Sequence, residues 1–270
     1  MQHNASRKAN AAGNTPALPM LTNAAEQLTQ VAQAMAQKLN AEVAFLSDDA
    51  KEIEQCTALV TSTFLEREPL TTALLAGGVS AELNPSLHAF SKVVVEEAAK
   101  GGLTVVVKVH DEVKAVCIVT PYESVHGPSE ALPGLEPVFD VLDRLGIAYD
   151  KHCAASGGKV RMDKTIDLPL AATAQDFQGK NAAEMAMFLG VMKAKAQGFT
   201  HCIAKATSNS AAVLAKNGFE LLAEVDYKMY TFQGMKPFEK IPNFKSAKLM
   251  YRSLANFDAP GLKTRTVPKL

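Results

Sequence analysis

Hydrophobic and polar residues follow two patterns along this chain, one typical of helices and one typical of strands. Apolar residues three or four positions apart, as at Ile53, Cys56 and Val60, predict an amphipathic helix. Short runs rich in valine, as in 103–109 and 113–120, predict strands, and the polar link between these two predicts a hairpin. Both patterns recur along the chain, so the sequence predicts an α/β (α+β) protein.

The predicted elements follow one another with short links from residue 43 onward. Strands are expected at 43–47, 103–109, 113–120, 165–172, 201–205, 219–225 and 247–251. Helices are expected from Asp48 or Asp49 onward and at 85–100, 135–145, 180–197 and 208–216, most of them ended by a glycine. The order β-α-β-α-β in the second half indicates one mixed sheet and not two domains.

The two ends of the chain differ from this pattern. Residues 1–40 are rich in Ala, Asn and Gln, and Glu26 is their single acid. We expect them to form a flexible extension with one helix at 22–39; a transit peptide is an alternative, because such segments lack acids. The folded domain is then expected over 41–255 and a tail over 256–270.

Composition and charge exclude several classes of protein. The 270 residues contain 28 Lys and Arg against 28 Asp and Glu, a formal net charge of +0, so no charge excess favours nucleic acid or an anionic membrane. The hydrophobic share of 47% and the charged share of 21% are those of a globular protein. We therefore expect no nucleic-acid or membrane partner, and the oligomeric state, a monomer or homodimer, stays open.

Cysteine and histidine spacing argues against a metal site. The four cysteines are far apart and form no CxxC pair, and the six histidines show no HExxH spacing. We therefore expect no metal cofactor, and thiols that stay reduced, which favours a cytoplasmic protein.

A possible phosphate-binding loop joins the strand at 165–172 to the next helix. It reads Gln178-Gly-Lys-Asn-Ala-Ala183. Small residues at a helix start let successive backbone N–H groups approach a phosphate, and the helix dipole favours its negative charge. Read alone, the hexapeptide fits an ordinary helix N-terminus equally well.

Together with Lys216-Asn-Gly-Phe219 downstream, this layout resembles the acetyl-CoA-binding half of the GNAT acetyltransferases. Their pyrophosphate loop is Q/R-x-x-G-x-G/A; Gln178 and Ala183 match it, while Asn181 stands in place of the central glycine. The resemblance implies a GNAT fold: a mixed, mostly antiparallel central sheet, splayed at the fourth strand and flanked by helices. It also implies acetyl-CoA as co-substrate, bound by Leu170, Ala171, Ala172, Thr173, Gln178, Gly179, Lys180, Asn181, Ala182 and Ala183.

The implied roles of the fourth strand are specific. An amide near Leu170 to Ala172 would face the thioester carbonyl, and the amides of Ala172 and Thr173 would pair with pantetheine.

A narrower resemblance is to the insect dopamine and arylalkylamine N-acetyltransferases. It is carried by Thr63-Phe-Leu-Glu-Arg-Glu-Pro-Leu70, Gly234-Met-Lys-Pro-Phe238 and Ser246-Ala-Lys-Leu-Met250. In that group the glutamate of the E-P-L segment is the proposed general base, which implies this role for Glu68. A serine in the short helix after the fifth strand corresponds to Ser210, whereas a second serine of some members is replaced here by Ala206.

Glu68 has a chemical reason to act as a base. An alkyl ammonium with a pKa of about 10 must lose a proton before its nitrogen attacks a thioester. A buried carboxylate with a raised pKa is able to take that proton, directly or through water. The alternative is a solvated glutamate next to Glu66. Ser210 likewise either stabilises the departing sulfur or only caps its helix; the tyrosine that many GNAT enzymes carry there is Leu214.

The sequence thus predicts an acetyl-CoA-dependent N-acetyltransferase acting on a small primary amine, an arylalkylamine by the nearer resemblance. The acceptor pocket is expected within residues 64–90 and 121–160, which are rich in apolar side chains and contain few bases. A polyamine, an amino acid or a protein amine as acceptor, and a non-catalytic acyl-CoA-binding regulatory module, remain alternatives.

Overall fold

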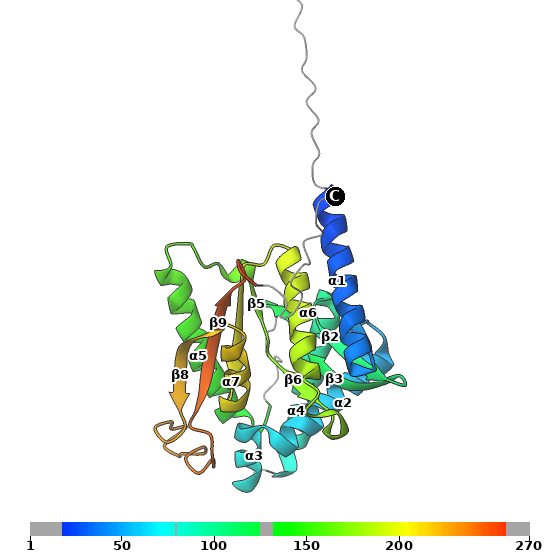
Figure 1. Ribbon diagram of the computed structural model, residues 1–270. Helices are drawn as coiled ribbons and strands as arrows, with labels where there is room; N and C mark the ends of the chain where they lie inside the picture. Colours follow the sequence, from blue (N-terminus) through cyan, green and yellow to red (C-terminus); the bar gives the residue numbers. More distant parts are fainter. Residues whose placement is uncertain (1–17, 79, 125–131, 258–270) are drawn as a thin grey trace, which may run out of the picture.

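A computed structural model of the chain describes residues 18–257, apart from Val79 and residues 125–131 (Figure 1). Its helices are α1 (Leu18–Leu39), α2 (Ala50–Arg67), α3 (Pro69–Ala76), α4 (Ser80–Gly101), α5 (Glu136–Ala155), α6 (Ala182–Ala196) and α7 (Ser208–Lys216). Its strands are β1 (Glu42–Phe45), β2 (Val105–Val109), β3 (Glu112–Cys117), β4 (Thr120–Pro121), β5 (Thr165–Asp167), β6 (Ala171–Thr173), β7 (His201–Ala206), β8 (Glu220–Asp226) and β9 (Ser246–Ser253). Within this part of the chain, no helix is both long and apolar enough to cross a membrane.

The strands form two sheets that meet at the stretch 165–173. One sheet has the order β1-β2-β3-β6 and the other β4-β5-β7-β9-β8. The pairing of β5 with β7 is parallel, whereas each of the other ladders is antiparallel. The predicted mixed, mostly antiparallel architecture is confirmed.

The predicted strand 165–172 changes its partner halfway along. The amide of Leu168 still donates to Ile203 of β7 at 3.0 Å, but the carbonyl of Leu170 already accepts from Ile118, next to β3, at 2.9 Å. Pro169 lies between them, and a proline has no N–H to contribute to a ladder. The strand therefore divides into β5 and β6 at this proline, and the two sheets separate at the fourth predicted strand, which is the expected splay.

Helices cover both faces of the sheets, because strand residues point alternately to opposite sides. Val105 and Val107 pack into a cluster with α6 and α1, while Val106 packs into a cluster with α2 and α4. α5 covers the face of the second sheet opposite to α6 and α7. At Gly190 the axis of α6 comes so close to the sheet that an added Cβ would lie 2.8 Å from the carbonyl oxygen of Leu103.

Two predicted boundaries were wrong. The helix expected to end at Gly146 continues to Ala155, and the later residues Tyr149 and Cys153 of this helix are buried in the core. The helix expected at 85–100 begins at Ser80 and includes Pro85, which lies in its second turn.

The helix expected in the N-terminal extension is present and starts slightly earlier than predicted, at Leu18. Val31, Met35 and Leu39 of α1 are buried in the same cluster as residues of α6, and Figure 1 shows the two helices side by side. The helical part of the extension is therefore packed on the domain. Residues 1–17 of the extension and 258–270 of the expected tail lie outside the described residues.

Candidate active site

Glu68 lies between two helices, as the C-cap of α2 and the N-cap of α3. Its backbone N–H donates to the Phe64 carbonyl at 3.1 Å, which closes α2. Its carboxylate caps α3, accepting from the Thr71 backbone N–H at 2.7 Å and from the Thr71 hydroxyl at 2.8 Å. Pro69 follows as the first residue of α3, where its fixed φ suits the helix and its missing N–H leaves no unpaired donor. The E-P-L segment is therefore a helix start that holds a carboxylate in a fixed place.

The surroundings of Glu68 shift its proton affinity upward. The residue is half-buried, and burial raises the pKa of its carboxyl. The hydrogen bonds from Thr71 and from the Leu70 amide act in the opposite direction, because they stabilise the charged form, but burial outweighs them. The carboxyl of Glu68 therefore holds its proton more tightly than an exposed glutamate, as a base working near neutral pH requires.

Glu68 borders a large apolar cluster, the aromatic cluster, that joins α3, α5 and the β8–β9 connection. Apolar residues from both stretches expected to form the acceptor pocket belong to it: Phe64, Leu65, Leu70, Leu74, Phe90, Tyr122, Val138, Phe139 and Tyr149. The cluster also extends beyond residues 64–90 and 121–160. The β8–β9 connection adds Tyr227, Tyr230, Phe232, Phe238, Ile241 and Phe244. The G-M-K-P-F segment at 234–238 was the sequence signal for this contribution.

The loop before α6 has the geometry of an anion-binding turn. Gly179 and Asn181 have φ angles of 76° and 58°, both left-handed, and Asn181 is the N-cap of α6. The Asn181 side chain makes no capping hydrogen bond, so the first amides of α6 have no side-chain acceptor from that residue. Asparagine adopts left-handed dihedrals more readily than most residues, which explains how it replaces the expected glycine. The backbone here fits a phosphate group.

The individual side chains of this loop differ in exposure. Gln178, Gly179 and Lys180 are exposed, Ala182 is buried and Ala183 is half-buried. The Lys180 ammonium lies 4.0 Å from the centre of the Phe177 ring, so it packs on an aromatic face at the rim of the loop.

On the edge of β6 that faces the splay, two residues turn their backbone N–H groups away from β3. Val116 pairs with Ala172, and the flanking bonds Ile118 N–H to Leu170 and Ala174 N–H to Lys114 fix the alternation of the ladder. The amides of Leu170 and Ala172 therefore face β3, so the expected pairing of the Ala172 amide with pantetheine is wrong. Ala171 and Thr173 are the residues that turn their amides to the splay.

One side chain links the two halves of this region. Nη2 of Arg67 donates to the Thr173 carbonyl at 2.7 Å, on the edge of β6 that faces the splay. Arg67 immediately precedes Glu68, so this bond ties the α2–α3 break directly to the strand expected to hold the co-substrate. The structure thus brings Glu68 and β6 together.

Ser210 has a helix-capping environment. Its hydroxyl is exposed and donates to the Thr207 carbonyl at 3.1 Å, within the first turn of α7. Leu214 and Ala206, the positions at which the resemblance implied a tyrosine and a second serine, are both buried. Ser210 is therefore an exposed hydroxyl in the first turn of α7.

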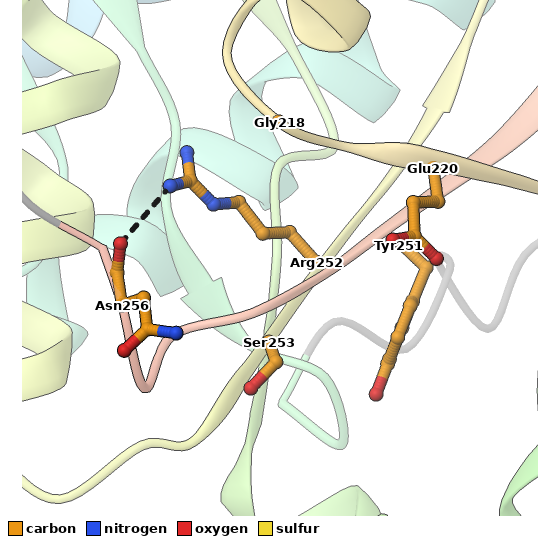
Figure 2. A pocket seen from close by; sticks show the side chains of 6 residues that line it. All are labelled: Gly218, Glu220, Tyr251, Arg252, Ser253 and Asn256. Carbon is orange, nitrogen blue, oxygen red and sulfur yellow. Dashed lines mark hydrogen bonds between the residues drawn. The ribbon is translucent and has the colours of Figure 1, made fainter.

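Two hollows elsewhere on the surface have no part in this arrangement. One, of about 370 Å³, lies beside the first residues of β7 and is lined by Gly218, Glu220, Tyr251, Arg252, Ser253 and Asn256 (Figure 2). Its arginine bonds to the Asn256 carbonyl at 3.4 Å and stacks 4.5 Å above the Phe257 ring, as a structural arginine does. The other is a surface depression around Lys114, whose ammonium pairs with Asp176 and with Glu112, each at 2.9 Å.

The described residues contain no group of three or more His, Cys, Asp and Glu side chains that is arranged to hold a metal ion.

Comparison with solved structures reveals the family of folds. The mosquito arylalkylamine N-acetyltransferase like 5b superposes with a TM-score of 0.63 at 18% identity, over 79% of this chain and 100% of that chain. The C-terminal condensation domain of Ebony, in complex with beta-alanyl-dopamine, has a TM-score of 0.62 at 15% identity, over 79% and 98%. The polyamine N-acetyltransferase of Drosophila melanogaster has a TM-score of 0.54 at 15% identity, over 79% and 100%.

This chain has the GNAT fold. No protein-family model and no curated protein sequence matches the chain. In the GNAT fold, the split of β5 from β6 is the splay of the central sheet, and α6 is the helix that follows the splayed strand. The three proteins differ in the amines that their names give, so the GNAT fold leaves the acceptor open.

Proposed function

We propose that this chain is an acetyl-CoA-dependent N-acetyltransferase that acetylates a small primary amine, with Glu68 as the general base. The observation that carries the proposal is the carboxylate of Glu68, which is half-buried with a raised pKa and is fixed by Thr71. The preceding residue, Arg67, bonds to the Thr173 carbonyl of β6. Direct transfer of the acetyl group requires a general base and the strand that binds acetyl-CoA to lie in the same region.

The co-substrate fits the second half of the site. The left-handed turn at Gly179 and Asn181 and the first amides of α6 suit the pyrophosphate of acetyl-CoA. The outward amides of Ala171 and Thr173 suit the amide groups of pantetheine, which would extend the sheet as an added strand. Ala171 is then the donor closest to the point of the splay, and its N–H would stabilise the charge that develops on the thioester oxygen.

Glu68 and Ser210 would act on the two ends of the transfer. Glu68 takes a proton from the bound ammonium, so that the free amine attacks the thioester carbonyl. The leaving group is a thiolate whose conjugate thiol has a pKa of about 8.5, so it departs with little assistance. The Ser210 hydroxyl on α7 would stabilise that sulfur, and its contribution is expected to be small because the thiolate departs readily.

The acceptor that the site favours is an arylalkylamine. The aromatic cluster supplies several rings and one nearby carboxylate with a raised pKa, which suits a flat apolar body bearing a single amine. A polyamine would instead require several spaced acids. Asp167 is a second buried acid, but the ammonium of Lys205 lies 3.9 Å from its carboxylate, which partly neutralises it.

The remaining alternative is an acyl-CoA-binding module without catalysis. Binding and turnover separate it from an enzyme: acetyl-CoA should raise the melting temperature by mass action, and tyramine should then release free CoA thiol. A thermal shift with acetyl-CoA, but no release of CoA thiol when any primary amine is added, would favour the binding module. No thermal shift at millimolar acetyl-CoA would refute the proposal altogether.

The four cysteines are free and buried, which supports the proposal of a reducing, cytoplasmic location.

A further inference from the structure

Two tyrosines of the β8–β9 connection have nearly the same surroundings but different hydroxyl groups. Tyr227 and Tyr230 are 1% and 2% exposed, and their rings lie 6.0 Å and 5.4 Å from the ring of Phe238. The Tyr230 hydroxyl donates to the Pro137 carbonyl at 3.0 Å. The Tyr227 hydroxyl has no hydrogen-bond partner among the described residues. Tyr227 is therefore the exception that needs a physical reason.

The position of Tyr227 is tightly fixed. Its backbone N–H donates to the Lys245 carbonyl at 2.9 Å. The carboxylate of Asp226 accepts from the amides of Lys228 and Met229 at 2.8 Å and 3.1 Å, which forms the turn that follows. A loose side chain would rotate to find water, but this one is held with its hydroxyl in an apolar environment. Such an unpaired buried hydroxyl is costly unless a ligand satisfies it.

The unpaired hydroxyl lies on the Glu68 side of the aromatic cluster. Tyr227 shares that cluster with Leu70 and Leu74, which belong to the helix that Glu68 caps. The pKa of Tyr227 is raised by two effects. Burial is the larger one, and the negative charge of Glu68 is the second. Glu68 itself is half-buried, whereas Tyr227 is buried.

We propose that the Tyr227 hydroxyl binds the amine of the acceptor, as the second hydrogen-bonding group beside Glu68. A primary ammonium carries three N–H donors. Glu68 takes one proton, and the phenol oxygen of Tyr227 accepts a hydrogen bond from a second N–H, which directs the lone pair left by deprotonation. The phenol stays neutral throughout, so Tyr227 binds and orients the amine without exchanging a proton. This inference rests on the proposed N-acetyltransferase function.

The test compares Tyr227→Phe with Tyr230→Phe, each of which removes only one hydroxyl. Tyr227→Phe should raise the KM for phenylethylamine about tenfold, the effect of one hydrogen bond, with kcat and the KM for acetyl-CoA unchanged. Its melting temperature should stay constant or rise, because no protein partner loses a hydrogen bond. Tyr230→Phe should leave the amine KM unchanged and lower the melting temperature by about 2 to 4 °C, since the Pro137 carbonyl loses its donor.

Calorimetric binding of phenylethylamine to the CoA-saturated protein gives a second readout, in which Tyr227→Phe should weaken binding to a similar degree. An unchanged amine KM and affinity in Tyr227→Phe would overturn the inference and leave the proposed function standing. A fall in melting temperature like that of Tyr230→Phe would show that the hydroxyl has a protein partner and would also overturn it. So would a loss seen with tyramine but absent with phenylethylamine, because the hydroxyl would then bind the ring substituent. A wild-type chain that acetylates no amine would refute the proposed function itself.

Discussion

Replacing Glu68 tests the base with the fold held constant, if the substitution is chosen with care. Glu68→Gln keeps an oxygen that accepts from both donors of Thr71, now at 2.7 and 2.8 Å, and so preserves the cap of α3. Glu68→Ala removes the cap as well, at a cost of about 0.5 to 2 kcal/mol of folding stability. The melting temperature should therefore fall for Glu68→Ala and remain near the wild-type value for Glu68→Gln.

The loss of activity should be similar in both variants. A general base contributes about a hundredfold or more to turnover, which corresponds to about 2.7 kcal/mol of the activation barrier. We expect both variants to lose at least that factor in kcat/KM at neutral pH. In the wild type, kcat/KM should rise with pH through the raised pKa of Glu68, because the carboxylate is the active form. In the variants that step should be absent and the rate should keep rising toward the amine pKa of about 10.

The assay is steady-state release of CoA thiol from pH 5.5 to 10, with melting curves on the same samples. The hundredfold loss should shrink above pH 9, where free amine no longer has to be generated. A Glu68→Gln variant with a near-normal rate at neutral pH would refute the base assignment. A loss that is constant across the whole pH range would show that Glu68 acts only in binding.

Four further substitutions, the last with Gly77→Ala as its control, test other parts of the account. Thr71→Val removes a hydrogen bond that stabilises the charged form of Glu68, so the rise of kcat/KM should move to higher pH; a shift to lower pH would contradict the electrostatic argument. Ala183→Glu places a carboxylate in the first turn of α6, which the helix dipole tolerates but a pyrophosphate does not, so calorimetry should detect no acetyl-CoA binding to a folded variant; unchanged affinity would locate the phosphate elsewhere. Ser210→Ala should lower kcat less than Glu68→Gln does, and a larger loss would reverse the ranking. Gly190→Ala should destabilise the fold by about 1 to 3 kcal/mol in urea unfolding, because its Cβ would meet the Leu103 carbonyl oxygen at 2.8 Å, whereas Gly77→Ala, with its nearest contacts at 3.4 Å, should be nearly neutral.

The sequence predicted most of the helices and strands because their periodicity is local. Ala182–Ala196 and His201–Ala206 lie within a residue or two of their expected bounds, and the hairpin of β2 and β3 is where the valine runs indicated. Local signals also mislead. Gly146 marked a helix end but lies inside α5, because the residues after it, such as Tyr149 and Cys153, pack into a core that distant segments supply.

The candidate site was predictable where a short motif carries it and not where long-range packing builds it. Glu68 was found from the E-P-L segment, and its cap, burial and raised pKa all follow from neighbours that the fold supplies. The direction of the β6 amides depends on the register with β3, which no local pattern reveals, and the expected donor was wrong by one residue. Tyr227 and Tyr230 were expected to pack or to line the site, and the sequence left this choice open, since the β8–β9 connection reaches the aromatic cluster only through the fold.

The central claim is that this GNAT-fold chain acetylates an arylalkylamine. The most direct test measures kcat/KM with acetyl-CoA for tyramine, tryptamine and dopamine against spermidine and a lysine peptide, and identifies the N-acetylated product by mass spectrometry. The account predicts acetylated product with a clear preference for the three aromatic amines, since the proposed site combines the aromatic cluster with the carboxylate of Glu68. Equal or better use of spermidine or the peptide would contradict the arylalkylamine assignment, and no acetylated product from any of the five would contradict the proposed enzyme.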